Sequence, residues 1–181
     1  MTDVKPRIPP LVGSPLRFGL IGGVVGFALI LVLYFIGTHP FLIPVFMDFR
    51  ILLLSVFFVF CLKELRDYYW GGFLYFWQAM IACFIVVITY AVIASGLILL
   101  FGVLVPQFVA TYVAQFTEKA RQFPPDVIER IGKEAFERSL ATLPGTSSFD
   151  LALLYFGQCF IIGLFISIII SVILRRQPQN V

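Results

Sequence analysis

The sequence predicts an all-α, polytopic membrane protein with four transmembrane helices and an amphipathic helical hairpin between the third and the fourth. Hydrophobic residues make up 60% of the chain and charged residues 13%, whereas soluble domains contain about 45–50% and about 25%. The mean hydropathy is +1.00, and the apolar residues are gathered in four long runs. These observations indicate a surface that faces lipid rather than water.

The first two runs predict spans at about 18–36 and 44–62. The first contains no charged residue and matches the roughly 20 residues that cross a hydrocarbon core. It is longer than the apolar region of a cleaved signal peptide, about 7–15 residues, so we expect a retained helix. The second run carries Asp48 and Arg50 near its start and no charge deeper in.

The third and fourth runs predict spans at about 73–104 and 150–174. The third is longer than one bilayer core and too short for two spans and a turn, so we expect one long helix, tilted or broken near Ala94–Gly96. Ser147 and Asp150 stand three apart at the start of the fourth run, which is typical of a capping box.

Residues 106–148 form the longest hydrophilic stretch and predict two short amphipathic helices lying on the membrane surface. The first has Phe108, Tyr112 and Phe116 at helical spacing, and a Pro-Pro pair then breaks the chain. The second contains oppositely charged residues four apart, which stabilise a helix. These pairs are Glu129 with Lys133 and Glu134 with Arg138.

Residues 17–176 are expected to form a single membrane domain, flanked by cytoplasmic tails at 1–16 and 177–181. Lys and Arg near span ends mark the cytoplasmic side. Such residues cluster before the first span, after the second and after the fourth: Lys5, Arg7, Arg17, Lys63, Arg66, Arg175 and Arg176. The cations of the 106–148 loop lie farther from the spans, so this loop is placed outside the cytoplasm.

Small residues recur at helical spacing in the first and last spans. Such faces let membrane helices approach closely, so we expect these two helices to pack together, or else against a partner protein. The residues expected at this packing are Gly19, Gly22, Gly23, Gly26, Gly163, Ser167 and Ser171.

Five polar side chains are candidates for a polar or lipid-binding site: Asp48, Arg50, Lys63, Arg66 and Gln78. Charged groups inside a membrane often line an ion path or polar pocket. Alternatively, Asp48 interacts with the helix dipole and Arg50 reaches the outer headgroups. Two positions apart on one helix, these two would point to different faces and not pair with each other.

Lys63 and Arg66 also allow two interpretations. They could hold a lipid or lipid-linked phosphate, or they belong to the ordinary belt of cations and aromatic side chains at a membrane interface. Gln78 would direct its amide at a neighbouring helix or a cavity.

Catalytic and metal-binding patterns are sparse in this sequence. His39 is the single histidine, and Cys61, Cys83 and Cys159 lack metal-ligand spacing. The net charge of +3 is small, and the Lys and Arg residues that carry it are scattered along the chain. Both observations argue against nucleic-acid binding. We therefore expect a protein that is not an enzyme, with no cofactor and no metal.

The run Lys63-Glu-Leu-Arg-Asp67, then Gly71-Gly72 and the segment 76–79, Phe-Trp-Gln-Ala, resembles a bacterial family of four-helix membrane proteins. The family is catalogued as domain of unknown function four-one-nine-nine. The similarity extends from the first span to the segment ending at Arg176. It implies a bacterial inner-membrane location and the same four spans, and it supplies no catalytic or binding residues.

Two functions are consistent with these features. The first is a non-enzymatic subunit or assembly factor of a membrane protein complex, with membrane lipids and a membrane protein or a second copy of the chain as partners. The second is a small carrier or a flippase for polyprenyl-phosphate-linked lipids, acting as an oligomer through Asp48, Arg50, Lys63 and Arg66.

Overall fold

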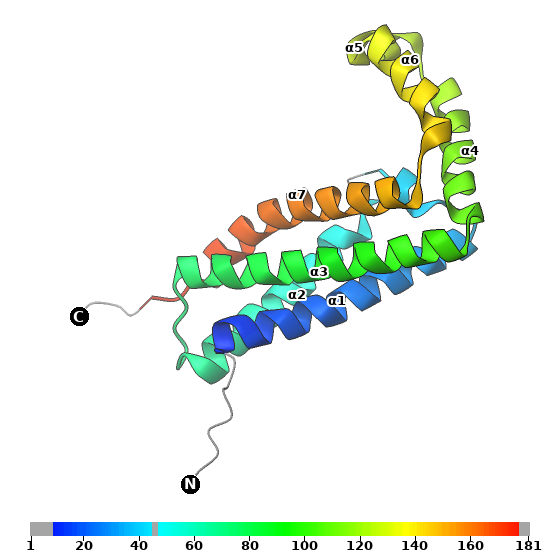
Figure 1. The fold of residues 1–181 in the computed structure, drawn as a ribbon. Coiled ribbons are helices and arrows are strands. Elements are labelled where there is room, and N and C mark those ends of the chain that lie inside the picture. The colour runs from blue at the N-terminus through cyan, green and yellow to red at the C-terminus, as the bar shows by residue number, and fades with distance from the viewer. Residues whose placement is uncertain (1–8, 45–46, 178–181) are drawn as a thin grey trace.

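The computed structural model describes residues 9–44 and 47–177, and in these ranges the protein is helical (Figure 1). Four long helices form a bundle, and three shorter ones extend from it. The bundle helices are α1 (Pro10–Phe35), α2 (Phe49–Glu64), α3 (Phe76–Leu104) and α7 (Ser148–Leu174). The others are α4 (Gln107–Arg121), α5 (Pro125–Ile131) and α6 (Lys133–Thr142). The all-α prediction is confirmed for this part of the chain.

Among the described residues, three helices, α1, α3 and α7, are long and apolar enough to cross a membrane. The sequence predicted four such helices, and α2 is the one that falls short. It has 16 residues, about 24 Å at 1.5 Å per residue, against a hydrocarbon core of about 30 Å. The predicted second span began at residue 44, but α2 begins at Phe49 because Asp48 is its N-cap. Residues 45 and 46 lie outside the described ranges.

The bundle has two ends of different character, which we call the terminal end and the arm end. At the terminal end α1 begins, α2 ends in a π-helical turn (Leu65–Tyr69), α3 begins and α7 ends. There Leu74 and Arg176 exchange backbone hydrogen bonds of 2.8 Å, which join the α2–α3 loop to the chain after α7. The described chain therefore begins, at Pro9, and ends, at Gln177, near this end (Figure 1).

The predicted tails fall mostly outside the described ranges, because residues 1–8, with Lys5 and Arg7, and residues 178–181 are not described. In the described part of the first tail, α1 already begins at Pro10, so residues 10–16 are helical. Proline suits the first turn of a helix, where its missing N–H has no partner to lose.

The small residues of α1 face α3, so the predicted packing of the first span on the last is wrong. α3 lies between α1 and α7 (Figure 1). A Cβ atom added at Gly23 would lie 2.9 Å from the Cβ of Ile93 and 3.0 Å from the carbonyl oxygen of Tyr90. One at Gly163 on α7 would lie 2.5 Å from a methyl group of Val87. The glycine faces of α1 and α7 thus let α3 pack closely against both helices. α3 itself is one continuous helix from Phe76 to Leu104.

The segment between α3 and α7 forms three helices instead of the predicted two. α4, α5 and α6 extend away from the arm end (Figure 1), and we call them the arm. The predicted second helix is divided at Gly132, whose φ of 94° belongs to the left-handed region. Glu129 and Lys133 consequently lie on different helices, so the helical pairing predicted for them is wrong.

Candidate functional site

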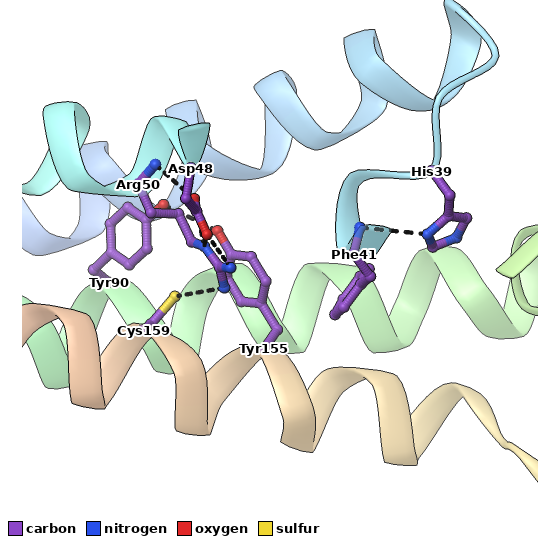
Figure 2. A network of polar contacts seen from close by, with 7 residues as sticks. All are labelled: His39, Phe41, Asp48, Arg50, Tyr90, Tyr155 and Cys159. Carbon is purple, nitrogen blue, oxygen red and sulfur yellow. Dashed lines mark hydrogen bonds and ion pairs between the residues drawn. The ribbon is translucent and has the colours of Figure 1, made fainter. Parts of the chain in front are cut away.

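A buried ion pair lies at the start of α2 (Figure 2). The Nε of Arg50 donates to both carboxylate oxygens of Asp48, at 2.8 and 2.7 Å, and Arg50 Nη2 donates to the same carboxylate. The side chains are only 5% exposed for Asp48 and 8% for Arg50. Buried charges of this kind require a partner, and each of these two supplies it for the other.

The sequence argument that Asp48 and Arg50 cannot pair is wrong, and so is the idea that Arg50 reaches the outer headgroups. Asp48 is not part of the helix: its ψ of 116° is extended, and its carboxylate accepts the backbone N–H of Arg50 at 2.9 Å. Helical spacing therefore does not separate the two side chains. The N-cap position turns the carboxylate back over the first turn of α2.

Two tyrosines and a cysteine complete this cluster (Figure 2). The guanidinium of Arg50 lies 4.8 Å from the ring centroid of Tyr155, a cation–π contact. Its Nη1 lies 4.0 Å from the sulfur of Cys159, and the hydroxyls of Tyr155 and Tyr90 are 3.0 Å apart. Sequence reasoning did not select Tyr90 or Tyr155. The available signal for Tyr155 was its place in a row of residues four apart on α7, which includes Leu151 and Cys159. Tyr90, on α3, had no such signal.

The cluster lies deep in the bundle. Tyr90 is halfway along α3, and its hydroxyl occupies the place that a Cβ atom at Gly26 would take. α2 thus begins well inside the bundle, and the chain that leads to it includes buried Pro40 and His39. Non-helical backbone at membrane depth is tolerated where protein covers it.

His39 joins this non-helical segment to the arm. Its side chain is buried, and its Nε2 lies 3.2 Å from the carbonyl oxygen of Phe108 on α4. Its backbone N–H donates to Gln115 Oε1 at 3.1 Å, and Lys119 Nζ donates to the carbonyl of Leu42 at 3.1 Å. Hydrogen bonds at Phe108, Gln115 and Lys119 of α4 therefore attach the arm to the bundle.

Aromatic rings surround His39. The ring centroids of Phe108, Tyr112 and Phe41 lie 4.7, 5.2 and 5.6 Å from that of the imidazole. Burial among these rings lowers the pKa of His39 from its ordinary 6.5 to about 4, although the hydrogen bond to Phe108 opposes the shift. The imidazole is therefore neutral at physiological pH.

The terminal end carries a second polar group of residues. Glu64 accepts a hydrogen bond from Ser14 Oγ at 2.8 Å and pairs with Arg17, which links α1 to the end of α2. Arg66 donates from Nε to Asp67 at 2.7 Å. That contact raises the pKa of Arg66 and lowers the pKa of Asp67. The sequence indicated Lys63 and Arg66 here but not the role of Glu64.

The comparisons with known proteins identify a family. The sequence model of the family DUF4199, described as a protein of unknown function, matches residues 17–176 of this chain. This chain belongs to the DUF4199 family. Comparison with curated proteins found no match, and comparison with solved structures found none. The resemblance noted from the sequence is thereby confirmed at the level of the family.

The candidate residues of this DUF4199 chain do not form one site. Asp48 and Arg50 lie together in the bundle, whereas Lys63 and Arg66 lie at the terminal end. Gln78 instead caps its own helix, because its Oε1 accepts the backbone N–H of Tyr75 at 3.1 Å. Within the described residues of this DUF4199 chain, no three His, Cys, Asp or Glu residues are grouped so as to hold a metal ion.

Proposed function

We propose that this chain is a non-enzymatic subunit or assembly factor of a membrane protein complex, and that the arm binds the partner protein. The observation that carries the proposal is the position of α5 and α6, which extend beyond the bundle (Figure 1). α6 has no buried residue. A helical extension that packs so little on its own chain contributes little to the bundle and is available to another protein.

The surface of the arm suits a folded protein partner outside the bilayer. Its exposed cations and carboxylates are interspersed, with Asp126, Arg130, Lys133, Glu137 and Arg138 all exposed. Phe123 and Phe136 stack at 6.1 Å, and Phe123 remains 40% exposed. An apolar centre with a mixed charged rim is the usual composition of a protein interface.

The proposed topology has four membrane crossings, both termini in the cytoplasm and the arm outside it, in a bacterial inner membrane. Two observations support it. The first and last described residues, Pro9 and Gln177, lie near one end of the bundle, as an even number of crossings requires. The Lys and Arg residues next to the helix ends also gather there, as expected on the cytoplasmic side. Because α2 alone is shorter than the hydrocarbon core, the residues immediately before it would complete the second crossing.

Site-specific photo-crosslinking in native membranes tests the proposal. A photoreactive residue at Glu137, exposed on α6, should give a discrete crosslinked product with one protein species. The same residue at Leu153, which is 57% exposed on α7, serves as a control facing lipid and should not give that product. If Glu137 crosslinks to no protein while the chain is correctly inserted, the arm does not bind a partner.

A second candidate, a carrier or lipid flippase, is favoured by the charged, non-helical start of α2 deep in the bundle. Transporters place binding sites at interrupted helices of this kind. In reconstituted vesicles, Asp48→Asn and Arg66→Gln should then each abolish movement of a polyprenyl-phosphate-linked lipid. Full transport by the double variant would exclude this candidate.

A further inference from the structure

The terminal end contains a depression between α1 and the end of α2. It has a volume of about 380 Å³ and is lined by Phe18, Phe60, Lys63, Glu64, Asp67 and Tyr68. A neighbouring depression of about 510 Å³ shares Glu64 and Tyr68 and adds Arg17 and Tyr69. Together they form one surface on which apolar, basic, acidic and aromatic groups meet.

These groups follow a fixed order along the bundle axis. Phe60, Lys63 and Asp67 are spaced three or four residues apart, so they lie on one face of α2 and its π-helical extension. α2 runs toward the terminal end, which makes Phe60 the deepest of the three and Asp67 the outermost. The distance is about 10 Å at 1.5 Å per residue, enough to cross a headgroup layer of roughly 5–8 Å and enter the acyl region.

The charges in this surface are not equally available. Glu64 is already engaged by Ser14 and Arg17. None of the three ion pairs found among residues 9–44 and 47–177 includes Lys63, so its ammonium group can accept an anion. Asp67 is paired with Arg66, which donates to its two carboxylate oxygens at 2.7 and 3.2 Å and lowers its pKa. The Asp67 side chain is nevertheless 45% exposed, so a further donor can reach the remaining lone pairs of the ionised carboxylate.

We infer that this depression binds the headgroup of phosphatidylethanolamine. The phosphate meets the ammonium group of Lys63, the primary amine of the lipid meets Asp67 beside the rings of Tyr68 and Tyr69, and the acyl chains continue along Phe18 and Phe60. The order of the protein groups, apolar then basic then acidic with aromatic rings, matches the order of groups in this lipid. The inference goes beyond the proposed function, since it does not depend on the arm.

The same chemistry disfavours the other common headgroups. Phosphatidylglycerol has no amine, so it offers Asp67 only neutral hydroxyl donors, which make weaker hydrogen bonds to a carboxylate than a cationic amine does. The trimethylammonium group of phosphatidylcholine can contact the tyrosine rings, but it has no N–H to donate to the carboxylate. The primary amine can make both contacts, and hydrogen bonds between charged groups are the stronger kind.

Native mass spectrometry of the purified full chain tests the inference. The delipidated protein would be titrated with phosphatidylethanolamine, phosphatidylcholine and phosphatidylglycerol of identical acyl chains. We expect about a two- to fivefold preference for phosphatidylethanolamine, the range for one exposed charge pair. Equal binding of the three lipids would overturn the inference. So would binding of soluble phosphoethanolamine as tight as that of the lipid, because the acyl contacts would then contribute nothing.

Two variants connect the preference to the depression. Asp67→Asn should remove the preference over phosphatidylglycerol, whereas Asp126→Asn, the matched change on the arm, should leave it intact. Lys63→Gln should weaken binding of all three lipids, and Lys133→Gln on the arm should not. Retention of the full preference by Asp67→Asn, with unchanged affinity in Lys63→Gln, would show that the lipid binds elsewhere.

Discussion

At the scale of single residues, the charges that matter most are those that the protein itself covers. Asp48 and Arg50 neutralise each other in the bundle, and Tyr155 covers the guanidinium face. Such a pair adds little when compared with well-packed apolar residues, but loss of one partner leaves an unpaired buried charge. The pair therefore fixes where α2 begins and makes that position sensitive to substitution.

Asp48→Asn should lower the free energy of unfolding by about 3–5 kcal/mol, because it leaves Arg50 buried without its counter-ion. Combining it with Arg50→Met should recover most of the loss, since no buried charge then remains. Denaturant unfolding of the purified protein in detergent measures both effects. Asp67→Asn, at an exposed pair screened by solvent, should leave the stability nearly unchanged. A double variant less stable than Asp48→Asn would contradict this explanation.

His39 should make the protein sensitive to acid. Its pKa is about 4 in the folded protein against 6.5 ordinarily, so the unfolded chain binds more protons between these values. Stability should therefore fall as the pH is lowered from about 6.5 to about 4. The thermal unfolding midpoint across this range measures it. His39→Gln, which can still donate to Phe108, should show a smaller decline, and an identical decline would assign the acid sensitivity to other groups.

At the scale of helices, hydropathy and capping signals located the elements well, whereas pairing was harder to predict. The third and fourth spans agree with α3 and α7 within a few residues, and Ser147 with Asp150 does form the predicted capping box. α1 was assigned the wrong neighbour because a glycine stripe shows that a helix approaches closely without showing which one. Ile93 and Tyr90 gave no pattern of their own inside a uniformly apolar run.

Gly23→Ala should destabilise the bundle by about 1–3 kcal/mol, the range for overpacking. Its new methyl group would lie 3.0 Å from a backbone carbonyl oxygen of α3, which cannot easily move. Gly96→Ala is the matched control, because its Cβ would meet no atom within 4 Å and alanine favours a helix by about 1 kcal/mol. Both effects are read from unfolding in detergent. Equal stabilities of the two variants would contradict the close α1–α3 packing.

At the scale of the whole molecule, a bundle with a buried neutral core carries an arm at one end and a polar surface at the other. The sequence predicted the membrane class and the hydrophilic segment between the last two spans. It did not predict the late start of α2, because the N-cap role of Asp48 depends on the partners that cover it. It also did not predict the cluster around Arg50, since Tyr90, Tyr155 and Cys159 come from distant parts of the chain.

The most direct test of partner binding is quantitative affinity purification from native membranes in mild detergent. Wild type would be compared with Arg130→Glu, Lys133→Glu and Arg138→Glu combined on the arm, and with the charge-conserving changes Arg130→Lys, Lys133→Arg and Arg138→Lys. We predict one protein in fixed proportion with the wild type and the conservative variant, and about tenfold less with the reversed variant, a loss of about 1.4 kcal/mol. A chain recovered alone or as an oligomer carrying only lipid, or equal recovery of the protein with the reversed arm, would contradict the proposal.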